Sequence, residues 1–369
     1  MHAGTMSSLK GRLNNSAVGP RFGSTKIAAA VIRGFLTMVV PSVLLLIASH
    51  AALAQTETVL YNFCSQGGDL CTDGDQPYFS SVIFDSLGNL YGTTYYGGAN
   101  GYGEVFELSP VGSNWTETVL YSFPGEPQYR FPENDLIMDP SGNLYGTSGA
   151  SVFELSPSEG GWTAQWIWDG GTASGVTMDA AGNIFGTTMY PNSVYELTPN
   201  GQGGWNGNTI YTFSNATKDG ETPFGTLVLD NAGNLYGTAY GGGAHGDGAV
   251  YKLTLVTTGK KKGTWTEKLL YSFKGGTKDG SNPWAGIMFD ASGNIYGTTR
   301  LSGKYNYQGG TVYELVADDG KYKEKILWSF NNTDGGEPYD SLLLDGGNLY
   351  GTTSQGGSNG DGVVFEVTP

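Results

Sequence analysis

The chain has 369 residues, 60 of them glycine, and a formal net charge of −15 at pH 7. A protein this acidic repels polyanions, which argues against nucleic acid or an anionic membrane surface as a partner. The charges are scattered without an acidic block, which is typical of a solvated surface.

The first 54 residues predict a secretory signal peptide. They contain five Lys/Arg, no Asp or Glu, the apolar run GFLTMVVPSVLLLIAS and the small-residue end Ala52-Leu53-Ala54. A permanent anchor is the alternative, but a run of about 16 apolar residues that Pro41 interrupts is shorter than the roughly 20 that a spanning helix needs. We expect residues 1–54 to be removed. The mature chain, 55–369, is then secreted or periplasmic and has no membrane span.

The mature chain begins with the only two cysteines, Cys64 and Cys71, in FCSQGGDLC. In exported proteins such neighbouring cysteines become oxidised to a disulfide, and the spacing is not that of a CxxC redox or zinc motif. The sequence therefore predicts one local disulfide that closes this loop.

From residue 56 onward, four short β-type runs recur six times between Gly, Pro, Asn and Asp clusters. Their clearest part is a decapeptide, which reads DSLGNLYGTT from Asp85 and returns as DPSGNLYGTS, DAAGNIFGTT, DNAGNLYGTA, DASGNIYGTT and the shortened DGGNLYGTT. It is typical of a tight corner in which the Asp caps the turn and the Gly adopts the left-handed conformation. The aromatic residue of the corner recurs at spacings of 54, 40, 51, 60 and 54 residues, which are lengths of propeller blades.

The sequence thus predicts an all-β fold, a monomeric six-bladed β-propeller over residues 55–369, with four antiparallel strands per blade. We letter these strands a to d from the centre outward. The first run, 56–63, is of d type and the last is of c type, so we expect the N-terminal strand to pair with the last blade and close the ring. The a–b corners and c–d hairpins share one face, the corner face. The b–c and d–a loops share the other, the loop face.

The candidate binding residues lie in loops of the loop face. Aromatic side chains with polar tips are suited to stacking on sugar rings. The candidates are Tyr95, Tyr96, Tyr102, Tyr240, His245, Trp284, Tyr305 and Tyr307. Trp284 also belongs to a set of four residues that follow a proline, with Tyr78, Phe224 and Tyr339, and for this set packing between blades is the favoured interpretation.

Acidic residues near the predicted channel are the candidates for chemistry. Four positions before the Asp that ends strand a, five units have a small residue and one has Asp135, with Asp340 and Glu133 in neighbouring positions. These three carboxylates could form an acid–base pair or hold Ca²⁺, and solvated channel acids are the alternative. Apart from that Ca²⁺ we expect no metal or cofactor. The d–a turns repeat Asp-Gly, which turn chemistry explains, at Asp73, Asp219, Asp279 and Asp334.

The run FDSLGNLYGTTYYGGANGYGEVFELSPVGSNWTETVLYSF resembles the GloVer tandem repeat of bacterial exported proteins, the choice-of-anchor group. The resemblance covers nearly all of residues 56–369. It implies export and a tandem-repeat β fold, and it brings no catalytic residues. The sequence ends at Pro369 without a sorting signal, so the resemblance does not extend to a C-terminal anchor.

The sequence therefore favours a non-catalytic propeller that binds an extracellular glycan or protein through its loop face. The alternative is an extracellular lyase or hydrolase acting on carbohydrate, or a metal-dependent lactonase, that uses Asp135, Asp340 and Glu133.

Overall fold

The computed structural model describes residues 58–68, 70–77, 80–126, 129–171, 174–214, 219–305 and 309–369. By its contacts the chain divides into two units, Met1–Thr58 and Val59–Pro369. The expected signal peptide lies outside the described residues, as do Tyr78 and Tyr307. In the part of the chain that is described, no helix is both long and apolar enough to cross a membrane.

The second unit is a β-propeller of six blades, as the repeat predicts, and its sheets are antiparallel. Blade 1 contains β1 (Ile83–Phe84), β2 (Leu90–Thr94), β3 (Glu104–Val111) and β4 (Asn114–Ser122); blade 2 contains β5 (Pro132–Met138), β6 (Leu144–Ser148), β7 (Ser151–Ser158) and β8 (Gly161–Trp168); blade 3 contains β9 (Thr177–Met178), β10 (Ile184–Thr188), β11 (Ser193–Pro199) and β12 (Trp205–Thr212).

Two of the remaining blades carry extra short strands on the loop face. Blade 4 contains β13 (Gly220–Pro223), β14 (Val228–Leu229), β15 (Leu235–Gly242), β16 (Ala249–Leu255) and β17 (Trp265–Ser272); blade 5 contains β18 (Gly280–Ser281), β19 (Met288–Phe289), β20 (Ile295–Thr299), β21 (Leu301–Ser302), β22 (Thr311–Asp318) and β23 (Lys321–Ser329); blade 6 contains β24 (Leu343–Asp345), β25 (Asn348–Thr353) and β26 (Val363–Val367). The 3₁₀ helix η1 (Gly259–Lys261) lies in the c–d hairpin of blade 4.

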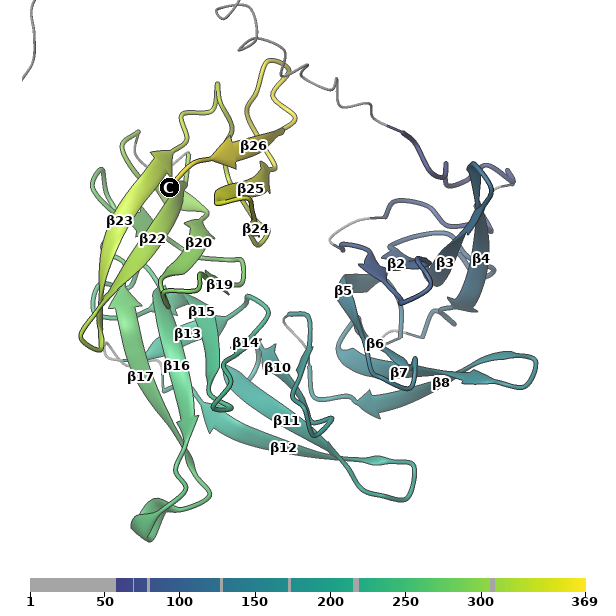
Figure 1. Cartoon of the computed structure of the whole chain (residues 1–369), viewed down its shortest axis with the longest axis horizontal. Helices are drawn as coiled ribbons and strands as arrows, with labels where there is room; N and C mark the ends of the chain where they lie inside the picture. The colour runs from purple at the N-terminus through teal and green to yellow at the C-terminus, as the bar shows by residue number, and fades with distance from the viewer. Residues whose placement is uncertain are drawn as a thin grey trace, which may run out of the picture. The chain divides into compact units, whose positions relative to one another are not determined.

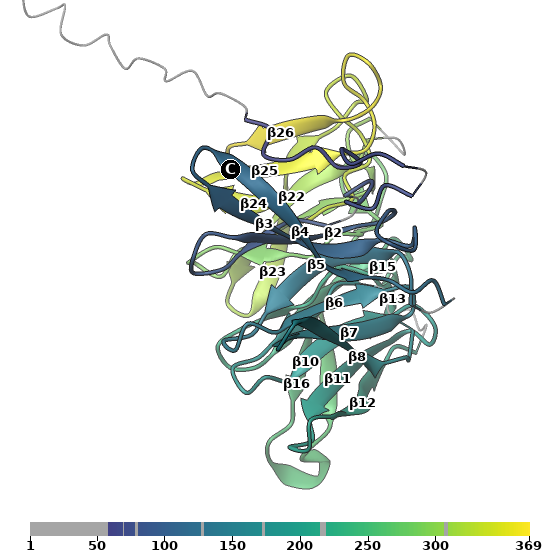
Figure 2. The same ribbon diagram turned by 90° about the vertical axis from the view of Figure 1, so that its right-hand side faces the viewer.

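Consecutive blades bury one apolar cluster at each of the five seams from blades 1 and 2 to blades 5 and 6. Leu136 and Phe153 of blade 2 pack with Val105 and Phe123 from blade 1, and the next four seams are built in the same way. Short inner strands such as β14, β19 and β24 lie at the centre, and the long d strands lie on the outside (Figure 1). Figure 2 shows the sheets from the side, with β24, β25 and β26 uppermost.

The inner strands approach one another closely where the sequence places small residues. A Cβ atom on Gly286 would lie 2.8 Å from the Thr226 carbonyl oxygen and 3.0 Å from the Ser341 hydroxyl, and one on Gly175 would lie 2.8 Å from the Thr226 hydroxyl. These residues are at the aligned position four before the terminal Asp, where small residues allow the inner strands to approach one another.

Five of the six decapeptides form the expected a–b corner with an Asp cap, and the shortened sixth copy turns through two glycines, with Asp345 paired to Asn348. In blade 5, Asp290 accepts hydrogen bonds from the backbone amides of Ser292 (2.8 Å) and Asn294 (2.9 Å), from the Asn294 side-chain amide (2.8 Å) and from the Tyr296 hydroxyl (3.3 Å). Gly293 has a φ of +82°, the left-handed conformation that favours glycine. Burial acts to raise the pKa of Asp290, but the hydrogen bonds from Asn294 and Ser292 hold it below its ordinary value.

We expect Asp290→Ala to destabilise the propeller by about 2 kcal/mol, because four donors lose a charged acceptor. Chemical denaturation at pH 7 measures the change in the free energy of unfolding. Because the pKa of Asp290 is depressed in the folded state, its contribution is present above pH 4 and disappears as the pH falls through the folded pKa. Asp318→Ala, at an exposed hairpin position, is the control and should leave stability unchanged. Equal stability of the two variants would contradict this account of the corner.

The N-terminal segment departs from the expectation that it closes the last blade. Residues 59–63 form no strand, and within the described residues β26 pairs with β25 alone, so blade 6 has three strands. The segment is instead held by blade 1. The Phe63 ring lies 4.9 Å from that of Phe106, and the Tyr61 hydroxyl donates a 2.9 Å hydrogen bond to Asp73.

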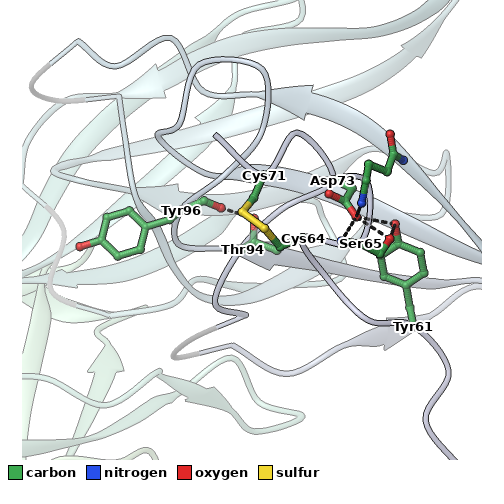
Figure 3. The surroundings of a disulfide bond; sticks show 8 residues. Tyr61, Cys64, Ser65, Cys71, Asp73, Thr94 and Tyr96 are labelled. Atoms are coloured by element: carbon green, nitrogen blue, oxygen red, sulfur yellow. Dashed lines mark hydrogen bonds between the residues drawn. A yellow bond between two sulfur atoms is a disulfide. The ribbon is translucent and has the colours of Figure 1, made fainter. Parts of the chain in front are cut away.

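Cys64 and Cys71 form the predicted disulfide. Figure 3 shows it beside Thr94 and Tyr96, with Asp73 next to Ser65 and Tyr61. The Cys64 amide donates to the Gly74 carbonyl (3.0 Å), and the Gly98 amide donates to the Cys71 carbonyl (3.0 Å). The closed loop is thereby fixed to the b–c loop of blade 1, and Asp73 is held just beyond it.

Candidate functional site

The loop face of blades 4 to 6 carries a row of three aromatic rings, which we call the aromatic row: Phe224, Trp284 and Tyr339. The ring centroids of Phe224 and Trp284 are 3.8 Å apart, and those of Trp284 and Tyr339 are 5.4 Å apart, edge to face. Tyr240 adds a second edge-to-face contact to Trp284 at 5.5 Å. All four side chains are half-buried, so the row is fixed by the protein and still reaches solvent.

Equivalent loops of successive blades position this row. Each of its three rings follows a proline that precedes strand a, and successive blades bring these positions side by side. The Asn282 side-chain amide donates to the Tyr240 carbonyl (3.1 Å), and the Thr238 hydroxyl donates to the Ala285 carbonyl (2.8 Å). These bonds tie blade 4 to the loop of blade 5 that carries Trp284.

A polar group borders the aromatic row. The Arg300 Nε donates to Glu337 at 2.9 Å, and its Nη1 lies 3.4 Å from the Tyr240 hydroxyl. The Tyr339 hydroxyl also donates to Glu337 at 2.9 Å, and the Arg300 guanidinium lies 5.2 Å from the Tyr339 ring centroid. Burial raises the pKa of Tyr339, and its hydrogen bond to Glu337 raises it further. The hydroxyl therefore stays protonated at neutral pH and remains a donor.

A second aromatic cluster lies on the loop face between blades 1 and 2. Tyr95 stacks on Phe131 at 4.9 Å, while Tyr96 and Tyr102 lie 5.3 and 5.9 Å from the same ring. The Arg130 guanidinium lies 5.1 Å from the Phe131 centroid. All three predicted tyrosines of this cluster therefore contact the ring of the same residue, Phe131.

Of the other predicted loop residues, His245 and Tyr305 are described, and neither has a ring contact with the two groups. His245 is exposed in the b–c loop of blade 4. Tyr305 is 49% exposed and has the Lys304 ammonium 5.3 Å from its ring centroid. The structure thus brings five of the eight candidates into two clusters, and a binding role for each stays a prediction.

The channel acids come together only in part. The Ser81 amide donates to Asp135, and the Ser341 amide donates to Asp340 at 2.7 Å. Desolvation by the surrounding protein, followed by the charge of Asp135, raises the pKa of Asp340, although its side chain keeps access to solvent. Desolvation alone raises the pKa of Glu133. No set of three His, Cys, Asp or Glu side chains that could hold a metal is found in the described ranges.

A pocket of about 630 Å³ lies on the corner face, between blades 2 and 3, and is lined by Tyr145, Glu154 and Trp205 among others. Its polar groups bind one another. The Trp205 indole N–H donates to Glu154 at 2.9 Å, and the Tyr145 hydroxyl donates to Glu154 (3.3 Å) and to Asp139 (3.1 Å). The predicted aromatic residues lie on the loop face, and we therefore take the loop face as the candidate binding site.

Sequence reasoning missed Arg300, Glu337 and Phe131, and it favoured packing for Phe224 and Tyr339. Arg300 and Glu337 are ordinary charged residues in their own segments. Only the proline-aromatic pattern pointed to the row, and that pattern also fits rings buried between blades.

Comparison with known proteins gives a family and a fold. A family model described as the Gloeobacter/Verrucomicrobia repeat matches residues 173–369. Kuenenia stuttgartiensis hydrazine synthase has a similar structure, with a TM-score of 0.52 and 16% identity over 77% of this chain and 76% of that chain. Virginiamycin B lyase from Staphylococcus aureus aligns with a TM-score of 0.42 and 13% identity over 84% and 98%. A search of curated proteins found no match. At these identities the structural likeness shows the fold alone.

Proposed function

The chain belongs to the Gloeobacter/Verrucomicrobia repeat family, and from that premise we propose that it is a secreted, non-catalytic binding propeller whose ligand is an extracellular glycan. The observation that carries the proposal is the aromatic row of Phe224, Trp284 and Tyr339. The disulfide supports an oxidising compartment.

The chemistry of the row matches that of a sugar. A pyranose ring has an apolar face of C–H groups and a rim of hydroxyls. Fixed aromatic rings provide apolar surface with little entropy left to lose on binding. Beside the row, Arg300 offers further N–H donors, and Glu337 and the hydroxyls of Tyr240 and Tyr339 offer acceptors. Stacking in the middle and hydrogen bonds at the rim would therefore act on the same ligand.

A glycan array tests the proposal, followed by calorimetric titration of any positive glycan. We expect Trp284→Ala to weaken binding about 30-fold, the effect of losing a central aromatic contact worth roughly 2 kcal/mol. Trp284→Phe keeps a smaller ring and should lose less. A Tyr240→Ala variant should also bind more weakly, because it removes both an edge contact and a rim hydroxyl.

Trp328→Ala is the matched control, since Trp328 lies on β23 and is 45% exposed. It should bind like the unmodified protein. Silence of the unmodified protein on every glycan would refute glycan binding and leave a protein ligand. Binding that survives in Trp284→Ala would place the site elsewhere on the surface.

An enzyme remains the second candidate because desolvation and the charge of nearby Asp135 raise the pKa of Asp340. A carboxyl group with a raised pKa can act as a general acid. Mass spectrometry of glycans incubated with the unmodified protein and with Asp340→Asn decides between the two. Cleaved products that only the unmodified protein forms would establish an enzyme.

A further inference from the structure

Three seams of the propeller carry an aspartate and a glutamate that face each other. The aspartate comes from the d–a turn, and the glutamate comes from the d strand of the following blade. The pairs are Asp73 with Glu117, Asp219 with Glu267 and Asp279 with Glu324, and a tyrosine from the preceding d-type run accompanies each of them: Tyr61, Tyr211 and Tyr271.

The seam between blades 4 and 5 shows the arrangement most fully. The Tyr271 hydroxyl donates to Asp279 at 2.7 Å and lies 3.4 Å from a Glu324 oxygen, so a single hydroxyl contacts both carboxyl groups. The Lys274 amide donates to the same oxygen of Asp279 at 3.2 Å. The donors therefore converge on Oδ2 of the aspartate.

In all three pairs the glutamate has an oxygen without a donor, and in two pairs the aspartate has one as well, whereas both oxygens of Asp219 accept hydrogen bonds. Asp279 is 4% exposed and Asp73 is 0% exposed, yet Oδ1 of each has no hydrogen-bond partner. The Oε1 atoms of Glu117, Glu267 and Glu324 are buried and have no partner either. Two adjacent buried carboxylates cannot both be charged at an acceptable cost. The missing donor at each seam is therefore a proton on one of the two carboxyl groups.

The other seams provide an internal control. The strand position of these glutamates, paired with a leucine of strand c, is Ala164 in blade 2 and Gly207 in blade 3. The d–a segment before blade 2, 123–131, contains no Asp. The segment before blade 3 has Asp169 directly after β8, where it accepts hydrogen bonds from Ser151 and Tyr129. At these two seams no glutamate occupies the strand position that faces the turn. For the fourth such aspartate, Asp334, the matching sequence position is Glu57, which lies outside the described residues.

We propose that each of the three Asp/Glu pairs shares one proton and so acts as a pH-dependent clasp between a d–a turn and the d strand of the blade that follows it. The clasps hold while the proton is bound. When alkaline conditions remove it, each seam contains two like charges, one on a buried aspartate and one on a half-buried glutamate. The outer edge of the propeller is then expected to loosen at high pH, a property that suits a protein exposed to its surroundings.

The protonation states agree with this geometry. Desolvation first, then the charge of the neighbouring aspartate, raises the pKa of Glu117 and of Glu267 to about 7 and that of Glu324 to about 8. Burial acts to raise the pKa of Asp73 as well, but hydrogen bonds from Ser65 and Tyr61 lower it, so this partner is the charged one.

The other titratable groups that face the pairs do not change the expected direction of the pH dependence, which is a loss of stability as the pH rises. Tyr251 is close to Glu267 and Tyr313 is close to Glu324, and both are neutral because burial and the glutamate raise the pKa of each phenol. At the first seam the fully buried Glu104 adds a third carboxyl group, whose pKa is raised to about 9 by desolvation, Glu117 and Asp73. A glutamate with a raised folded-state pKa stabilises fully below about pH 4.5, and its contribution is lost as the pH rises through the folded pKa.

The test compares thermal unfolding of the protein between pH 5 and pH 10 with that of Glu117→Gln/Glu267→Gln/Glu324→Gln. Glutamine keeps the size of the side chain and stays neutral at every pH. We expect the melting temperature of the unmodified protein to fall by about 5 °C or more between pH 6 and pH 9. The triple variant should show a flatter profile and exceed the unmodified protein above pH 8. Glu159→Gln, at an exposed hairpin position, is the single-charge control.

Two results would overturn the proposal. One is a triple variant whose melting temperature falls with pH as steeply as that of the unmodified protein. The other is stabilisation at pH 9 by added Ca²⁺ that EDTA reverses and that the triple variant lacks, because the seams would then hold a cation in place of the proton. A triple variant that fails to fold leads to the single variant Glu324→Gln, to which the same two criteria apply.

Discussion

Gly237→Ala is expected to destabilise the propeller by about 3 kcal/mol, near the upper end for overpacking of a well-filled core. A Cβ atom at this position of β15 would lie 2.5 Å from the Tyr251 hydroxyl oxygen and 2.8 Å from a methyl carbon of Leu227. Tyr251 is 0% exposed and Leu227 is 2% exposed, so neither side chain can move into solvent. The glycine of the YGT motif thus provides the space for the aromatic ring of strand c.

Chemical denaturation measures this effect, and Gly241→Ala is the matched control. Gly241 lies in the same strand, and the nearest atoms to a Cβ there are 3.7 Å away, an ordinary van der Waals contact. The control should therefore unfold like the unmodified protein. If Gly237→Ala shared that behaviour, the seams would be more loosely packed than the contacts indicate.

The repeat determined what could be predicted of the fold. Each corner is stabilised within ten residues, so the Asp, Gly and Asn of DASGNIYGTT carried enough information to place a turn and two strands. The central approach of Gly286 to Thr226 also followed from alignment, because five of the six copies have a small residue at one position. The corners depend on local hydrogen bonds, and the central small residues are found by aligning the repeats. Both can therefore be predicted from the sequence.

The aromatic row could not be predicted with the same certainty, because its members are about 60 residues apart and become neighbours only through the angle between blades. From the sequence, Phe224 and Tyr339 are each explained by packing between blades. Only the structure shows that both rings contact Trp284. The Asp/Glu pairs escaped notice for a related reason. Asp279 is a natural turn residue and Glu324 is a natural strand-surface residue, so each had a sufficient local explanation.

For the N-terminal segment, the repeat predicted a strand pairing that the described residues do not form. Its sequence matches the d strands, and its rings behave like theirs toward the following blade: Phe63 meets Phe106 at 4.9 Å, as Phe273 meets Tyr313 at 5.1 Å. The pairing with β26 that the match predicts is absent. In the described residues, side-chain packing against blade 1 thus occurs without the strand pairing that the periodicity suggested. Sequence similarity alone could not show that only one of these two contacts forms.

Deleting residues 56–63 is accordingly expected to have the largest effect on stability of any change considered. The deletion uncovers Leu90, Phe106 and Leu108, which form a buried cluster with Tyr61 and Phe63 packed against it. Losing two large aromatic contacts costs about 5 kcal/mol or more, and the melting temperature should fall by about 10 °C or more. Differential scanning calorimetry measures the loss, and Phe63→Ala should reproduce part of it.

Hydrogen exchange shows where the loss occurs. If blade 1 is the true partner of the segment, the amides of β2 and β3 lose protection in the deletion variant, while those of β26 exchange as before. The amides of β26 would lose protection instead if the segment were the fourth strand of blade 6, and our correction of the sequence expectation would then be wrong. The distinction has a physical basis, because exchange reports broken backbone hydrogen bonds locally, whereas the melting temperature reports only their total.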